Sequence, residues 1–207
     1  MSAARSLPRW ASKLGSGGPV RITCFGSSTT EGYGASAPER SYPEVMRRRL
    51  EPFFPRGLVL NNRGISGESA LEMDGRIDDV IRTEPDLVIW QTGSNDVSRP
   101  VPLALFEHLT RDGLQRLRDA GAEIAIMDQQ YSTALEAFDT LPEFIRSLHA
   151  LAEAFGAPVF PRYALMRAWC DEGRFTIDTL SPDGTHMTDE GYRLLGEAVA
   201  DWLLTPA

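Results

Sequence analysis

Residues 20–25 read VRITCF, and Gly26, Ser27 and Ser28 follow them directly. A near-continuous apolar run of this length is typical of a strand that is covered on both faces. Segments with helical periodicity separate it from four similar runs, which lie at residues 58–61, 86–91, 123–127 and 158–160. This alternation predicts an α/β fold, namely a three-layer α/β/α sandwich of the flavodoxin-like kind with a five-stranded parallel sheet.

Helix start signals lie between these runs. Ser41 with Glu44, and Thr140 with Glu143, have the spacing of a capping box, in which each side chain satisfies a backbone NH of the first helical turn. Helices are therefore expected to begin at both places. A last helix is expected at about residues 188–204, with an apolar stripe that faces the sheet.

The length and charge of the chain limit its organisation and its partners. With 207 residues it has the size of one ordinary domain, and the glycine-rich segment 15–19 separates an N-terminal extension, residues 1–19, from a domain at residues 20–207. Lys and Arg number 21 against 29 Asp and Glu, which gives a formal net charge of −8. Such a surface repels phosphate backbones, so nucleic acid is not an expected partner.

Compartment and cofactors are inferred from what the sequence lacks. No stretch approaches the roughly 18 apolar residues of a membrane span. The N-terminal segment holds no continuous apolar core of a signal peptide, so a cytoplasmic protein is expected. Cys24 and Cys170 are expected to be reduced thiols. The histidines and cysteines have no metal-ligand spacing, so neither a metal nor another cofactor is expected.

Function is expected where the strands end, because ligands of open parallel sheets bind beyond the carboxyl ends of the strands. Ser28 follows the first expected strand, Gly64 the second and Asn95 the third. Asp183 and His186 lie just ahead of the last helix. These five residues are therefore expected to meet at one edge of the sheet.

Together the five residues contain the parts of an acyl-transfer site. An aspartate three residues before a histidine can accept the Nδ1 proton and leave Nε2 free to activate a serine. The Ser28 NH, the Gly64 NH and the Asn95 amide are suited to donate hydrogen bonds where negative charge develops. The sequence thus predicts Ser28 as nucleophile, His186 as general base and Asp183 as its orienting partner.

The same blocks resemble the SGNH hydrolases of the GDSL-esterase group, which are named for Ser, Gly, Asn and His. The resemblance runs from residue 20 to the C-terminus and rests on the order of the blocks, their places at the strand ends and the Asp-x-x-His ending. It implies the SGNH fold, a nucleophile at Ser28, an oxyanion hole of Ser28, Gly64 and Asn95, and hydrolysis of short-chain or acetyl carboxylic esters. An acyltransferase would use the same residues with an alcohol in place of water, so that alternative stays open.

One position departs from the family pattern. The family usually has Gly-Asp-Ser at the nucleophile, whereas this chain has Ser27 in the middle position. The missing aspartate neighbours the nucleophile and is not one of the four named residues, so activity is still expected, at a lower rate. Ser27 is an alternative reactive hydroxyl. Ser28 is favoured because Thr30 and Gly32 then match the residues that follow the family serine.

Other loops at the same edge are expected to line the substrate pocket. By position alone the candidates for substrate contact are Glu31, Tyr33, Gln130, Tyr131 and Phe175. The long segment at residues 129–140 is expected to shape specificity. The substrate class is a small-molecule, carbohydrate or lipid ester, and the negative net charge favours neutral or cationic substrates.

A non-catalytic nucleotide-binding module is the rival interpretation. Residues 32–37 match the G-x-G-x-x-G/A pattern of dinucleotide-binding loops. The true motif forms the turn directly after the strand and opens a helix, whereas here intervening residues separate the two and Pro38 follows. The sequence therefore favours the hydrolase.

Overall fold

The computed structural model describes residues 7–99 and 101–205, and in that part of the chain five strands form one parallel sheet. The strands pair in the order β2-β1-β3-β4-β5. Their bounds are β1 Val20–Gly26, β2 Leu58–Gly64, β3 Leu87–Gln91, β4 Glu123–Met127 and β5 Val159–Phe160. The predicted flavodoxin-like sheet is confirmed, with each strand within a few residues of its expected place.

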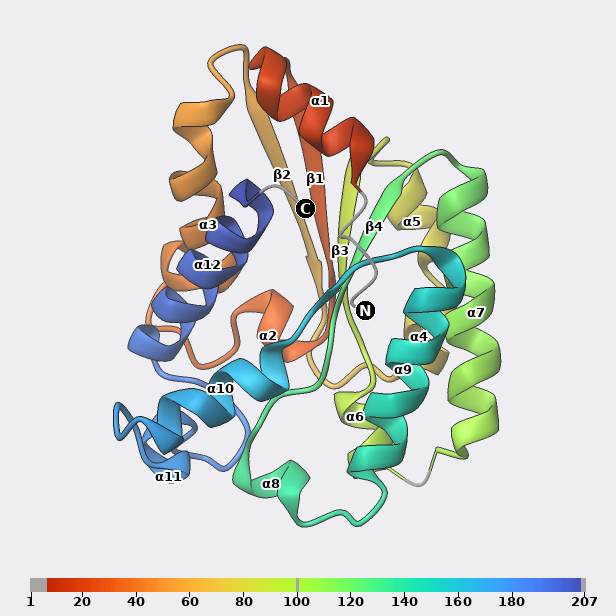
Figure 1. Ribbon diagram of the computed structural model, residues 1–207. Coiled ribbons are helices and arrows are strands. Elements are labelled where there is room, and N and C mark those ends of the chain that lie inside the picture. The colour runs from red at the N-terminus through yellow and green to blue at the C-terminus, as the bar shows by residue number, and fades with distance from the viewer. Residues whose placement is uncertain (1–6, 100, 206–207) are drawn as a thin grey trace.

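The order of the strands changes direction at β1. The chain runs outward from β1 to β2 and then returns to the other side of β1 to form β3. In such sheets the crevice at this switch point, outside the carboxyl ends of the strands, is the usual ligand site. Gly26 pairs with Gly64 at this end of the sheet, and Phe25 pairs with Trp90. Figure 1 shows this carboxyl edge at the lower end of the molecule.

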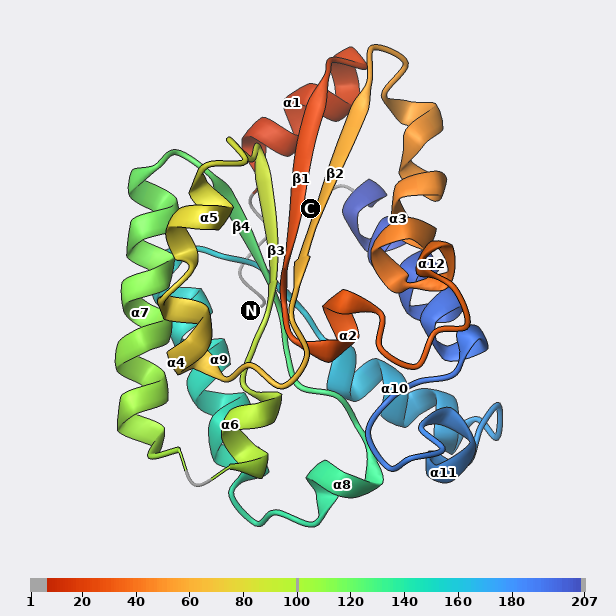
Figure 2. The same ribbon diagram turned by 180° about the vertical axis from the view of Figure 1, so that it is seen from behind.

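Helices cover both faces of the sheet (Figures 1 and 2). One face carries α1 (Pro8–Ser16), α3 (Tyr42–Leu50), α10 (Arg162–Asp171) and α12 (Asp189–Leu204). The other carries α4 (Ala70–Asp74), α5 (Ile77–Ile81), α7 (Leu103–Asp119) and α9 (Leu141–Phe155). The short helices and 3-10 turns are α2 (Ser28–Glu31), α6 (Ser94–Ser98), α8 (Thr133–Glu136), α11 (Ile177–Leu180), η1 (Pro38–Arg40) and η2 (Glu51–Phe53).

Each face of the sheet has its own hydrophobic core. Ile22 and Tyr192 are fully buried on the α12 side, and Phe106 is fully buried on the α7 side. Helices α3 and α12 approach closely because Gly196 has no side chain, since a Cβ there would lie 2.6 Å from Cβ of Val45. The apolar stripe predicted for the last helix therefore faces the sheet, as α12.

Helices begin near Ser41 and Thr140 as predicted, but the capping boxes predicted there are wrong. Ser41 is the N-cap of α3, yet its hydroxyl donates to the Pro38 carbonyl at 2.7 Å, and Glu44 pairs with Arg47 instead. The backbone of Thr140 is already helical, whereas a capping side chain needs an extended backbone to reach the NH groups of the first turn. Neither side chain caps its helix.

The predicted N-terminal extension packs onto the domain. Trp10 of α1 is 3% exposed, and its Nε1 donates to the Leu203 carbonyl at 2.9 Å. Its ring lies 5.1 Å from that of Phe54, centroid to centroid. Nζ of Lys13 lies 2.7 Å from Oδ2 of Asp86. Helix α1 therefore belongs to the core on the α12 side, at the end of the sheet opposite the carboxyl edge (Figure 1).

Both cysteines are free thiols, as expected. Burial raises the pKa of Cys24 to about 12, so this thiol stays protonated inside β1. Within the two described ranges, no helix combines the length and the apolar character needed to cross a membrane.

Replacing Trp10 by alanine tests whether α1 is part of the core. We expect Trp10→Ala to lower the free energy of unfolding by about 3 to 5 kcal/mol, because a large buried aromatic side chain is lost. Urea denaturation followed by circular dichroism measures it. Ser12→Ala, on the exposed side of the same helix, should stay within about 0.5 kcal/mol of wild type. Equal stabilities for the two variants would mean that α1 adds nothing to the core.

Candidate active site

Ser28 is the first residue of α2, and only Ser27 separates it from the end of β1. Figure 2 shows α2 at the lower end of β1. Ser28 is 8% exposed, and among the described residues neither its hydroxyl nor its NH has a hydrogen-bond partner. The first NH groups of a helix have no acceptor within the helix. Ser28 therefore presents both a hydroxyl and an open NH donor at the carboxyl edge of the sheet.

Ser27 lies in a different environment from its neighbour. It is 3% exposed, and its NH and its hydroxyl lie 3.0 and 3.2 Å from Oε1 of Gln91, the last residue of β3. The hydroxyl of Thr30 donates to the same oxygen at 3.2 Å. Gln91 thus bonds three groups of the turn that carries Ser28. Because the Ser27 hydroxyl is buried and bonded, the geometry favours Ser28 as the reactive serine.

Two glycines allow this turn to sit directly on the ends of β1 and β2. A Cβ on Gly26 would lie 2.4 Å from Oγ1 of Thr30 and 2.9 Å from the Gln91 carbonyl oxygen. A Cβ on Gly64 would lie only 2.0 Å from the backbone nitrogen of Glu31, at the end of α2. No side chain fits at either position, so both glycines are required for the close approach of α2 to the sheet.

The expected oxyanion donors differ in whether their N–H groups already form hydrogen bonds. The Asn95 amide uses one N–H to bond the Glu68 carbonyl at 2.7 Å, which leaves its second N–H available. The Gly64 NH donates to Oδ1 of Asn62 at 2.9 Å and is therefore already engaged. Gly67, on the same loop, has a left-handed backbone with φ of 80°, and its NH has no partner among the described residues. It directly precedes Glu68, whose carbonyl accepts the bonded N–H of Asn95.

Asp183 and His186 form a closed, hydrogen-bonded turn. Oδ2 of Asp183 lies 2.6 Å from Nδ1 of His186, and its Oδ1 accepts the NH groups of Thr185 and His186 at 2.9 and 2.6 Å. Partial burial raises the pKa of this carboxyl, but these hydrogen bonds outweigh it and lower the pKa to about 2. The carboxylate is therefore ionised at any working pH, and it fixes the ring with Nε2 free.

The turn that carries His186 lies against the residues that follow α2. The ring of Tyr33 lies 4.4 Å from that of His186, centroid to centroid, and the Tyr33 NH donates to the Ser28 carbonyl at 2.9 Å. An ideal Cβ at Gly34 would lie 3.3 Å from Cβ of His186. Among the described residues no hydrogen bond joins the Ser28 hydroxyl to the imidazole. Free enzymes often show loose catalytic hydrogen bonds that tighten when substrate binds.

Three of the five predicted substrate-contact residues lie near this site. Tyr33 is 55% exposed and flanks the imidazole of His186. The Glu31 carboxylate accepts the Ser66 NH at 2.9 Å, so it ties α2 to the loop after β2. Gln130 is 4% exposed, its amide oxygen accepts from Ser94 and Arg162, and its nitrogen donates to the Thr185 carbonyl, so the hydrogen bonds of this amide among the described residues are all to other protein groups.

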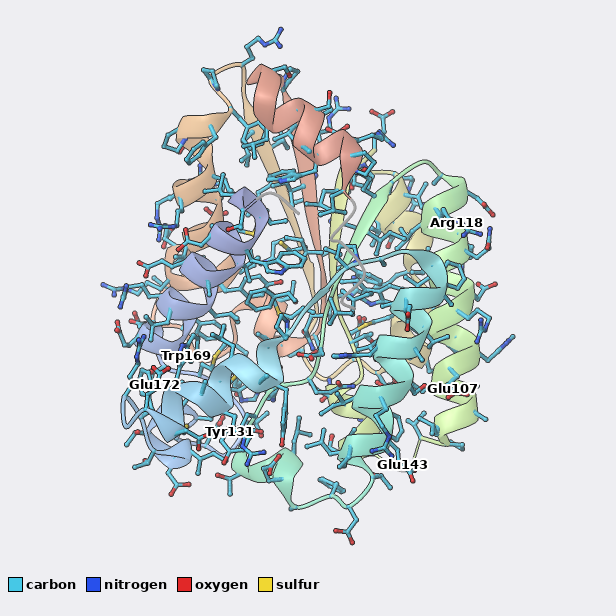
Figure 3. All side chains as sticks on the ribbon, viewed as in Figure 1. Glu107, Arg118, Tyr131, Glu143, Trp169 and Glu172 are labelled. Carbon is cyan, nitrogen blue, oxygen red and sulfur yellow. The ribbon has the colours of Figure 1, made fainter. Side chains whose placement is uncertain are left out.

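The other two lie farther along the same edge, around α8 and α10. Tyr131 packs edge-on against Tyr163 with centroids 5.6 Å apart, and Phe175 lies 6.4 Å from the ring of Trp169. Figure 3 shows Tyr131 beside α8 and Trp169 on α10. The rings of Tyr131 and Phe175 are partly buried against the core on the α12 side, so their contact with substrate stays a prediction.

The geometry of the described residues supports neither a dinucleotide-binding loop at residues 32–37 nor a metal site. Residues 32–37 form turns with positive φ at Gly32 and Gly34, and they lead into η1 and not into a helix that opens after a strand. In the part of the chain that the structure describes, no group of three or more His, Cys, Asp or Glu side chains is arranged to hold a metal ion.

Known proteins resemble this chain in sequence and in fold. The model of the non-GDSL lipase-like family matches residues 1–207. A lipolytic protein of the G-D-S-L family from Desulfitobacterium hafniense is similar in structure with a TM-score of 0.73 at 22% identity, covering 88% of this chain and 98% of that one. Among curated proteins, none shows significant similarity to this chain.

Two solved structures of carbohydrate esterases are also similar. The acetylxylan esterase Axe2 from Geobacillus stearothermophilus gives a TM-score of 0.76 at 20% identity, covering 89% of this chain and 94% of that one. A two-domain esterase active on acetylated mannans gives 0.78 at 22% identity, covering 98% of this chain. This chain corresponds to 54% of the two-domain enzyme.

The fold and the family together define a carboxylic ester hydrolase of the SGNH type. Within that class, the chain belongs to the non-GDSL lipase-like family. The family description agrees with Ser27 standing where the GDSL pattern has aspartate. The resemblance to SGNH hydrolases, which the sequence blocks indicated, is therefore confirmed.

Two residues of the site were not found from the sequence. Gln91 is the last residue of the apolar strand β3, and a glutamine at this position belongs to no known motif. Its contact with Ser27 joins residues 64 positions apart. Gly67 lies three residues after Gly64 in the same loop, and both are plausible donors by sequence alone. Only the side chain of Asn62, which occupies the Gly64 NH, distinguishes them.

Asp96 should make stability depend on pH. It follows Asn95 in α6, is 1% exposed, and accepts the Ala70 NH at 3.0 Å. Burial raises the pKa of this carboxyl to about 6 although the hydrogen bond opposes the shift, so the folded state binds the proton more tightly than the unfolded state. The free energy of unfolding therefore falls as pH rises from roughly 4 to 6, by about 3 kcal/mol at most.

Urea denaturation of wild type and Asp96→Asn at several pH values isolates this contribution. The difference in the free energy of unfolding, wild type minus variant, should decrease between about pH 4 and 6 and be flat above that range. Parallel curves across the whole range would show that the Asp96 carboxyl titrates normally.

Proposed function

We propose that the protein hydrolyses short-chain or acetyl carboxylic esters through an acyl-enzyme on Ser28. The observation that carries this proposal is the hydrogen-bonded pair of Asp183 and His186 at the sheet edge where α2 begins with Ser28, whose hydroxyl has no hydrogen-bond partner in the described part of the chain. A serine needs a nearby base to become a nucleophile, and that base needs a partner that fixes its tautomer.

The reaction proceeds in two halves. The Ser28 oxygen attacks the ester carbonyl carbon while Nε2 of His186 takes the hydroxyl proton, and the Asp183 carboxylate stabilises the imidazolium. The tetrahedral intermediate then collapses, the C–O bond to the alcohol breaks, and His186 returns the proton to the leaving oxygen. Water next attacks the acyl-enzyme with His186 again as base, which releases the acid and restores Ser28.

The negative oxygen of the intermediate needs donors that are not already bonded. The Ser28 NH and the second N–H of Asn95 meet this condition. For the third donor we place the Gly67 NH ahead of the expected Gly64 NH, because Asn62 already occupies the latter. Gly64 then serves by lacking a side chain where α2 crosses the end of β2.

An acetyl ester on a neutral saccharide is the substrate that we favour. The similar structures include enzymes described as acting on acetylated xylan and acetylated mannans. The net charge of −8 repels anionic substrates but does not repel neutral sugars. The exposed ring of Tyr33, next to the imidazole of His186, offers an apolar face to the alcohol part of the substrate.

An acyltransferase with the same residues is the nearest alternative. Its acceptor would be an alcohol in place of water, and product analysis with added alcohols separates the two reactions. A non-catalytic nucleotide-binding module is the alternative from another class. It predicts neither turnover nor labelling by an activated phosphonate.

Substitution of the nucleophile and the base tests the mechanism. Ser28→Ala and His186→Ala should each lower kcat for a short-chain nitrophenyl ester by at least roughly 10³-fold, because each removes the activated nucleophile. A fluorophosphonate probe should label wild type and Ser27→Ala, but not Ser28→Ala. Labelling that persists in Ser28→Ala and disappears in Ser27→Ala would assign the reaction to Ser27.

Substitution of Asn95 tests the oxyanion site. Asn95→Ala should lower kcat by about 10²- to 10³-fold with little change in KM, since the lost donor acts mainly on the charge of the transition state. Ser98→Ala, exposed on the same short helix, is the matched control and should retain wild-type kinetics. A loss that appears only in KM would place Asn95 in ground-state binding.

A further inference from the structure

Arg162 is a buried charge that the proposed mechanism does not use. It is the first residue of α10 and is fully buried, and burial lowers its pKa to about 10. Among the described residues no carboxylate forms an ion pair with it, and its Nε has no hydrogen-bond partner. A buried charge is costly unless its donors are satisfied. Its main polar partner is Oε1 of Gln130, which accepts from Nη2.

Gln130 connects three loops of the carboxyl edge. It lies in the loop after β4, and its Oε1 also accepts the Ser94 hydroxyl at 3.2 Å. Its Nε2 donates to the Thr185 carbonyl at 3.2 Å. Ser94 immediately precedes Asn95, and Thr185 immediately precedes His186. One buried side chain thus bonds the neighbours of the proposed oxyanion donor and of the proposed base.

We propose that Gln130 is a positioning residue, which holds the Asn95 loop and the His186 loop at a fixed separation. The proposal rests on the ester-hydrolase function proposed above. Gln130 was expected from sequence to contact substrate, but its amide faces inward and is occupied by protein partners on both sides. It acts through Asn95 and His186 and touches no reacting atom.

The chemistry of the amide explains why a glutamine suits this place. Its oxygen must accept from Arg162 and Ser94, while its nitrogen must donate to a carbonyl. The cation behind the oxygen polarises the amide and strengthens N–H donation to Thr185. A glutamate would keep the acceptor oxygen and give Arg162 a counter-ion, but it would lose that donor.

Substitutions at position 130 can therefore distinguish a role in positioning the catalytic groups from a role in folding. Gln130→Glu should unfold at a free energy equal to or above that of Gln130→Met, because Arg162 keeps a partner. Both variants should nevertheless lose kcat by about 10- to 100-fold, the effect of displacing catalytic groups by a fraction of an ångström to one ångström. KM for the nitrophenyl ester should stay within about twofold in both, because the substrate-binding surface is unchanged.

Gln129→Met is the matched control in the same loop. Gln129 is fully buried, and neither polar atom of its amide has a partner among the described residues. Removing an unbonded amide costs little, so this variant should keep wild-type kcat and KM.

Hydrogen exchange supplies a readout that does not depend on activity. In wild type the NH groups of Thr185 and His186 are bonded to Asp183, so the peptide that contains them should exchange slowly. We expect faster exchange there in both Gln130 variants and unchanged exchange in Gln129→Met. A Gln130→Glu protein with wild-type kcat, or with unchanged exchange in this peptide, would overturn the positioning role. Absence of ester turnover in wild type would instead refute the proposed function and leave the exchange result to decide the role of Gln130.

Discussion

The close pairing of Gly26 with Gly64 at the ends of β1 and β2 is the constraint on which the site depends. Any side chain at Gly64 would occupy the backbone of α2, and any side chain at Gly26 would displace Gln91 or Thr30. Because neither glycine carries a side chain, α2 lies directly on the carboxyl edge of the sheet. Ser28, the first residue of α2, therefore lies at the edge from which the loops after β2 and β3 start.

Three side-chain amides join the loops of that edge. Gln91 binds the nucleophile turn, Asn95 binds the loop after β2, and Gln130 binds the loop that carries His186. An amide donates and accepts without carrying charge, so it can be buried at little cost once both ends are bonded. Charged groups contribute as well: Arg76 donates to the Gly26 carbonyl at the end of β1 and forms an ion pair with Glu68. Arg162 is bonded through the Gln130 amide, and Asp183 is held by two NH groups and the imidazole.

The parts of the structure that depend on local sequence could be predicted, and those that depend on distant partners could not. Buried strands appear as apolar runs, so the sheet was predictable, and the bond between Asp183 and His186 follows from a spacing of three residues. The capping box predicted at Ser41 failed because Pro38 and Arg47 compete for its side chains, and the one at Thr140 failed because the backbone of Thr140 is already helical. No sequence signal predicts the bonds of Gln91 to Ser27 and of Gln130 to Thr185, which span 64 and 55 residues. The position of Gln130 predicted substrate contact instead. The state of the Gly64 NH likewise depends on where the Asn62 side chain turns.

The central claim is that the acyl group passes through a covalent bond to Ser28. The most direct measurement is acid quenching of the protein during turnover of an activated acetyl ester, followed by intact mass spectrometry and peptide mapping. We expect one acetyl group per chain, located on Ser28, which forms in a burst and disappears when the ester is exhausted. Steady turnover with no acyl group on Ser28 at any time, or with the group on another residue, would contradict it.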